Sequence, residues 1–142
     1  MTDNLFALLF LLPLPVWIAM LIFPRRNFTY RVVTSPWPFI ILGGVYTLFL
    51  LLALPGVLSG IGISAGYLQA LLLSEWGFLA LWAHLQALNL FVAVWIFRDA
   101  RYWGIATLPY LLLSLFTGPL ALGLYHLLRR RKEAGDPIRN LN

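Results

Sequence analysis

Residues 76–97, WGFLALWAHLQALNLFVAVWIF, decide the fold class of this chain. The stretch holds 22 residues, and none of them carries a formal charge. As an α-helix it would rise about 33 Å, which is enough to cross the hydrocarbon core of a bilayer. The charged run Arg98-Asp99-Ala100-Arg101 then closes it. We therefore predict a transmembrane helix over residues 76–97.

Three further uncharged stretches predict three more spanning helices, over residues 5–23, 37–54 and 105–128. Pro13 in the first of them and Pro119 in the last predict kinks. Residues 56–74 are apolar and rich in glycine, so we expect a loop and a short helix that lies in the interface or re-enters the bilayer. The predicted fold class is all-α, an integral membrane bundle of about four transmembrane helices plus this short helix.

The composition excludes an ordinary soluble domain. Hydrophobic residues make up 61% of the chain and charged residues 11%, whereas soluble domains have about 45–50% and about 25% respectively. A soluble chain of this size could not cover so much apolar surface. We expect one transmembrane domain over residues 1–128, followed by a basic and mobile tail over residues 129–142.

The ten basic residues fall into three clusters at the ends of the predicted spans. They are Arg25, Arg26 and Arg31; Arg98 and Arg101; and Arg129, Arg130, Arg131, Lys132 and Arg139. This placement predicts anchors that favour anionic lipid headgroups, and it does not indicate a nucleic-acid surface. With four spans the positive-inside rule leaves the orientation open, because five basic residues fall on each side of the membrane.

Several kinds of chemistry have no motif in the sequence. There is no cysteine, no phosphate-binding glycine loop, no paired His-x-x-His or Glu-x-x-His and no serine nucleophile motif. His84 and His126 fall at different predicted depths, which does not suit a bis-histidine haem. We expect no metal site and no required cofactor. The N-terminus has no signal-peptide or transit-peptide pattern, so we expect a bacterial or organelle-encoded protein, in a bacterial inner or photosynthetic membrane.

Polar side chains in the middle of residues 76–97 are the candidates for function, because such groups are costly in hydrocarbon. At about 100° per residue, Trp82, Gln86 and Asn89 share one helix face. His84 lies about 140° from Asn89, on a face with Phe91 and Trp95. For His84, Gln86 and Asn89, either an interhelical hydrogen bond or a ligand contact is open.

The same run resembles the core of the ABA4-like family, whose plant members are needed for neoxanthin formation in plastids. The family pattern reads Trp-x-His, four residues, Asp-Leu-Phe, and an Asp ten residues after the first. This chain keeps Trp82, His84, Leu90, Phe91 and Asp99 of that pattern. Pro24-Arg25 and Gly118-Pro119-Leu120 are also similar to the family. The resemblance implies a carotenoid-interacting membrane protein.

Asn89 stands where the family usually has Asp, and this departure bears on catalysis. Neoxanthin formation opens an epoxide without redox change, which needs an acid for the oxygen and a base for a carbon-bound proton. Asn89 can be neither, so the chain could bind a carotenoid without converting it. The candidate catalytic residues are His84, Asn89 and Asp99; for Asp99 a local pair with Arg98 or Arg101 is the plainer interpretation. The candidate ligand-binding residues are Trp82, Gln86, Phe91 and Trp95.

Two main hypotheses follow. The first is a carotenoid-interacting protein, either an isomerase-like, epoxide-opening enzyme or an accessory in xanthophyll metabolism. The second is a small pigment-binding or structural subunit of a photosynthetic or respiratory membrane complex, in which His84 would bind (bacterio)chlorophyll or pack. The expected partners are membrane lipid, carotenoid and, under the second hypothesis, other membrane subunits. A transporter is disfavoured because the spans hold no charge pairs and no duplicated halves.

Overall fold

The computed structural model describes residues 2–58 and 64–135, and all regular structure in these ranges is α-helical. The helices are α1 (Thr2–Leu11), α2 (Leu14–Ile22), α3 (Asn27–Thr34), α4 (Trp37–Leu58), α5 (Ala65–Leu73), α6 (Glu75–Trp103), α7 (Leu108–Ser114) and α8 (Gly118–Ala134). The predicted all-α fold class is confirmed. Residues 59–63 of the predicted loop and residues 136–142 of the predicted tail lie outside the described ranges.

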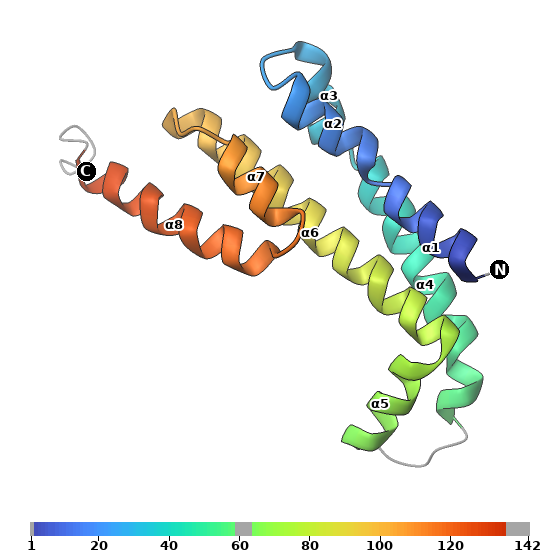
Figure 1. Ribbon diagram of the computed structural model, residues 1–142. Helices are drawn as coiled ribbons and strands as arrows, with labels where there is room; N and C mark the ends of the chain where they lie inside the picture. Colours follow the sequence, from blue (N-terminus) through green and yellow to red (C-terminus); the bar gives the residue numbers. More distant parts are fainter. Residues whose placement is uncertain (1, 59–63, 136–142) are drawn as a thin grey trace.

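The first predicted span consists of α1 and α2, which follow one another end to end (Figure 1). The break falls at Pro13, as predicted, because the proline ring excludes a continuous helix there. The polar stretch between the first two predicted spans contains a helix, α3, over Asn27–Thr34. The α3 helix is amphipathic, and it buries Thr29 and Val33. The hydroxyl of Thr29 donates a hydrogen bond to the Phe23 carbonyl and so fixes the turn between α2 and α3.

Helix α6 is the central element of the molecule. It runs between the group formed by α1, α2 and α4 and the pair α7–α8 (Figure 1). Ser74 caps its N-terminus, where the side chain accepts a hydrogen bond from Gly77 N, and Gly104 in the left-handed conformation caps its C-terminus. Buried side chains of α6, among them Leu90 and Phe97, pack with Trp17 of α2 and Leu42 of α4. Helices α2 and α4 therefore share one hydrophobic cluster with α6.

The segment predicted as one kinked span over residues 105–128 is a hairpin of two helices, α7 and α8. Gly118, the first residue of α8, donates its N–H to Asn89 Oδ1 in the middle of α6, at 3.1 Å. Lys132 Nζ, near the other end of α8, lies 3.2 Å from the Gly104 carbonyl oxygen. The hairpin therefore descends along α6 to its midpoint and returns, so that both of its ends lie beside the C-terminal end of α6.

Three helical stretches are long and apolar enough to cross a membrane: Asp3–Ile22, Asn27–Pro55 and Glu75–Trp103. The nine-residue α5 is too short to cross, in agreement with the predicted short helix between spans. The region predicted as a loose tail begins with ordered helix, since α8 continues to Ala134.

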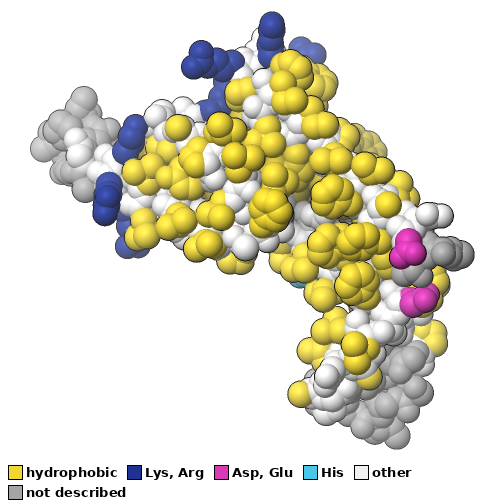
Figure 2. Space-filling view, in the orientation of Figure 1, with side chains coloured by type: hydrophobic (Ala, Val, Ile, Leu, Met, Phe, Trp, Pro, Cys, Tyr) yellow, Lys and Arg dark blue, Asp and Glu magenta, His cyan; other side chains and the backbone are white. Residues whose placement is uncertain are grey.

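The hairpin changes the charge balance of the two membrane sides. Arg101 belongs to the second basic cluster, and its Nη1 lies 3.1 Å from the carbonyl oxygen of Pro24, the residue before the first cluster. Lys132 of the third cluster contacts the carbonyl oxygen of Gly104, close to the second cluster. Figure 2 shows the Lys and Arg side chains of the described residues in two groups, at the top and at the left of the view, and an acidic pair at the opposite side. That pair is Asp3 and Glu75, in the first turns of α1 and α6.

This one-sided charge predicts the orientation. By the positive-inside rule the basic end faces the cytoplasm, with Asp3 outside and Gly135 inside. Because the chain has no cysteine, Asp3→Cys and Gly135→Cys each create a single labelling site. A membrane-impermeant maleimide applied to intact cells should label Asp3→Cys and reach Gly135→Cys only after permeabilisation. Labelling of both variants from the same side would instead indicate an even number of crossings.

Candidate ligand-binding site at the tip of the helical hairpin

A cavity of about 640 Å³ lies where the hairpin tip meets α6 and the α1–α2 break. We call it the hairpin-tip pocket. Its walls come from Phe10, Pro13, Leu14 and Trp17; from Trp82, Leu85, Gln86 and Asn89 of α6; and from Leu115, Phe116, Thr117, Gly118, Pro119 and Leu120. The lining is thus mostly apolar, with a few hydrogen-bonding groups on α6, as is usual for small-molecule sites.

The polar side chains that α6 contributes to this pocket are those that the helical angles predicted to share one face of the helix. Trp82, Gln86 and Asn89 all line it. Gln86 is buried, and the buried indole Nε1 of Trp82 has no hydrogen-bond partner among the described residues. The Trp82 ring is held by Phe6 of α1, with centroids 5.0 Å apart.

Asn89 also has a structural contact that the sequence alone did not suggest. Its Oδ1 accepts the Gly118 N–H, one of the N-terminal donors of α8 that no helix carbonyl can satisfy. The approach is close, because a Cβ on Gly118 would lie 2.6 Å from that oxygen. A carboxylate at position 89, as is usual in the resembled family, would face the same N–H and the positive end of the helix dipole.

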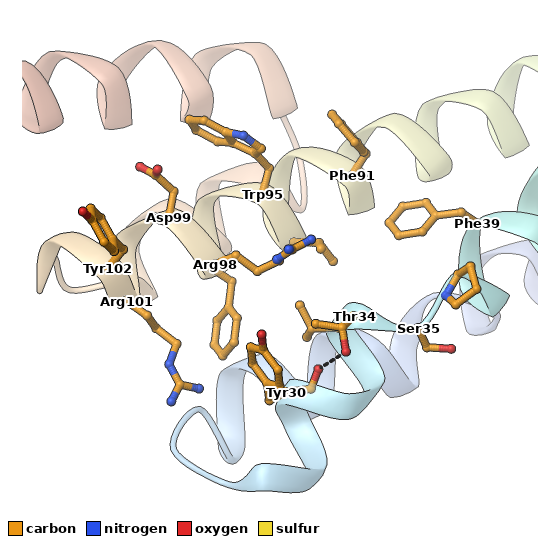
Figure 3. Close-up of a pocket in the computed structure, with 14 residues that line it drawn as sticks. Tyr30, Thr34, Ser35, Phe39, Phe91, Trp95, Arg98, Asp99, Arg101 and Tyr102 are labelled. Carbon is orange, nitrogen blue, oxygen red and sulfur yellow. Dashed lines mark hydrogen bonds between the residues drawn. The ribbon is translucent and has the colours of Figure 1, made fainter.

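His84 and Asp99 lie away from this pocket. The exposed His84 lies against Tyr46 of α4, with ring centroids 5.3 Å apart. Asp99 Oδ2 accepts a hydrogen bond of 2.6 Å from the Tyr125 hydroxyl and lies 3.4 Å from Arg129 Nε. Asp99 therefore links α6 to α8, and the expected local pair with Arg98 or Arg101 is not found. The reason is helical phase, since Asp99 points toward α8 while Arg98 points toward α3 (Figure 3).

Phe91 and Trp95 line a different cavity, between α3, the start of α4 and the C-terminal half of α6. Phe91 packs edge-on against Phe39 of α4 at 6.2 Å, and Trp95 packs against His126 of α8 at 5.1 Å. The seven candidate residues are therefore distributed around α6. The structure brings together Trp82, Gln86 and Asn89 and separates them from the other four.

The residues that other elements contribute to the pocket were not predicted from the sequence. Trp17 comes from α2, and Phe116 and Thr117 come from the hairpin turn. Gly118-Pro119 was a signal for this turn, but it predicted a kink and not a reversal of direction. In the described part of the chain, no group of three or more His, Asp or Glu side chains could hold a metal ion.

The family model described as ABA DEFICIENT 4-like (ABA4-like) matches residues 4–125. The chain belongs to the ABA4-like family. Family membership points to a role in carotenoid metabolism related to neoxanthin. The match extends from α1 to Tyr125 in α8, so it includes both contacts that hold the hairpin to α6. Comparisons with curated proteins and with solved structures gave no match.

The close contact at the hairpin tip predicts an asymmetry between two glycines of α8 in this ABA4-like protein. Gly118→Ala should lower the free energy of unfolding by about 1–3 kcal/mol, because the new methyl group meets Asn89 Oδ1. Gly123→Ala is the matched control, since nothing lies within 4 Å of its added Cβ. Thermal unfolding in mild detergent measures both. Equal melting temperatures for the two variants would contradict the close approach.

Proposed function

We propose that this ABA4-like protein binds a xanthophyll, with the oxygenated end ring of the carotenoid in the hairpin-tip pocket. The observation that carries the proposal is the convergence of Trp82, Gln86 and Asn89 in an apolar cavity at the middle of α6. Hydrogen-bonding groups buried among spanning helices are costly in lipid and usually mark functional sites.

The dimensions and surroundings of the pocket support this ligand class. Its volume of about 640 Å³ falls within the usual range for small-molecule sites, roughly 300–1,000 Å³. An end ring and part of a polyene fit such a space. Phe10, Phe116 and Leu120 line the pocket and are more than half exposed, at 51%, 83% and 53%. The remaining polyene can leave past these side chains into the bilayer.

The chemistry of the pocket supports binding more strongly than conversion. Opening an epoxide to an allenic alcohol moves one proton from carbon to a base, breaks a C–O bond and delivers one proton to oxygen, without net oxidation. Trp82, Gln86 and Asn89 can donate hydrogen bonds to the oxygen, but none of them exchanges a proton readily. His84 lies on another face. We therefore propose an accessory or binding role, and an isomerase activity only with a carboxylate at position 89.

A second function, a small pigment-binding subunit, has one observation in its favour. His84 is exposed near the middle of α6, where an imidazole facing lipid is costly. A chlorophyll-type pigment or a neighbouring subunit would cover it. This function predicts chlorophyll-type absorption bands and a large co-purifying complex, whereas the first predicts the three-peaked visible band of a carotenoid on a small particle.

The binding proposal predicts a selective loss in Gln86→Leu. The purified protein, reconstituted with an epoxy-xanthophyll or with an oxygen-free carotene, would be titrated by visible absorption. The variant should bind the epoxy-xanthophyll about two- to tenfold more weakly, the usual value of one hydrogen bond, and the carotene equally well. Gln69→Leu, the same change on an exposed site of α5, is the control. Equal affinities of Gln86→Leu and wild type for both pigments would rule out this pocket.

The catalytic part of the proposal is tested by Asn89→Asp. The variant should convert a bound xanthophyll epoxide into its allenic isomer, which has the same mass and a different chromatographic retention. Asn89→Leu, which also loses the contact to Gly118, should give no isomer. An Asp variant that binds the epoxide as wild type does but forms no isomer would contradict the role of the carboxylate.

A further inference from the structure

A second cavity, of about 940 Å³, lies at the basic end of the molecule, and we propose that it binds the phosphate headgroup of an anionic membrane phospholipid. We call it the interfacial cavity. Its polar rim includes Tyr30, Ser35, Arg98 and Arg101, and its apolar wall includes Phe39 and Phe91. It lies on a different face of α6 from the hairpin-tip pocket, so the proposal is independent of carotenoid binding.

Arg98 supplies the charge that points to an anion. Its side chain extends into the cavity between α6 and α3 (Figure 3). Arg98 takes part in neither ion pair near this cavity, those of Arg129 with Asp99 and with Glu133, and no carboxylate of the described residues forms a salt bridge with it. Asp99 also lines the cavity, but its carboxylate accepts from Tyr125 and faces α8. A guanidinium without a carboxylate partner at the edge of an apolar cavity is suited to a phosphate group.

Arg101 forms a second, fixed part of the rim. Its Nη1 lies 3.1 Å from the Pro24 carbonyl oxygen, and its guanidinium stands 5.8 Å from the centroid of the Phe97 ring. Neither contact neutralises its charge. Both arginines, Tyr30 and Ser35 therefore line the same cavity. Their summed charge favours an anionic headgroup over a zwitterionic one.

The apolar part of the cavity points to a lipid and not to free phosphate. Below the arginines the wall consists of Val94, Phe39 and Phe91, and the last two pack edge to face at 6.2 Å. Phe91 remains 57% exposed, so this wall is open toward the surrounding bilayer. Along α6, the basic residues Arg98 and Arg101 lie nearer the helix end than Val94 and Phe91, which suits a phosphate ester followed by acyl chains. Basic pockets of this kind between membrane helices bind lipid headgroups.

The test uses the full chain in mild detergent, exchanged against phosphatidylglycerol or phosphatidylcholine and examined by native mass spectrometry. Wild type should retain phosphatidylglycerol in preference to phosphatidylcholine. Arg98→Gln should weaken phosphatidylglycerol retention about fivefold, the usual contribution of one basic residue near an anionic surface. Arg130→Gln, which removes the same charge from an exposed site of α8 outside the cavity, should change it less than about twofold.

Three outcomes would overturn the proposal. Equal retention of the two lipids by wild type would exclude a headgroup-selective site, and this comparison needs no variant. Equal losses in Arg98→Gln and Arg130→Gln would show diffuse attraction to net charge. Displacement of the lipid by inorganic phosphate or by a prenyl diphosphate at equal concentration would show that the cavity binds a phosphate group that does not come from a phospholipid. Carotenoid binding by Gln86→Leu and wild type is unaffected by any of these results, so the two proposals fail separately.

Discussion

The hydrogen bond from Gly118 N to Asn89 Oδ1 is the interaction on which the arrangement of this molecule depends. A helix that begins inside a bilayer exposes backbone N–H groups that neither water nor lipid can satisfy. The Asn89 side chain meets that requirement from the middle of α6, and the absence of a side chain on Gly118 allows the approach. At the other end of the hairpin, Tyr125 and Arg129 bind Asp99. The two polar residues that first suggested chemistry therefore also hold α8 against α6.

This attachment has a consequence for the whole charge distribution. Because α7 and α8 reverse at the midpoint of α6, the cluster of Arg129 and its neighbours returns to the end that already holds Arg98 and Arg101. A continuous helix over residues 105–128 would have placed the same cluster on the opposite side. The equal count of basic residues on the two sides depended on a continuous last helix, whereas the hairpin places the described residues of the third cluster near the C-terminal end of α6.

Helix α6 divides its surface among different tasks. One face carries Trp82, Gln86 and Asn89 into the hairpin-tip pocket, another packs on α4 with His84 and Phe91, and a third binds α8 through Asp99. A single residue step of about 100° separates neighbours along the helix, so Arg98 and Asp99 face different partners although they are adjacent in sequence. Family membership points to a role in carotenoid-related metabolism, and this division explains why the residues of the family pattern do not converge on one small site.

The sequence by itself determined the all-helical class, the apolar stretches and the faces of α6. These features follow from hydrophobicity and from the helical period, which are local properties, and so the grouping of Trp82 with Gln86 and Asn89 was predictable. The helix over residues 27–34 was not predicted, because its apolar face is short and a polar sequence of this length is also typical of a loop. Only the tertiary structure decided whether Gly118-Pro119 kinks a helix or reverses it, which side holds the third basic cluster and what Asp99 binds. Each of these depends on contacts between residues 26 or more positions apart. Hydrophobicity and helical period describe only neighbouring residues, so they do not predict such contacts.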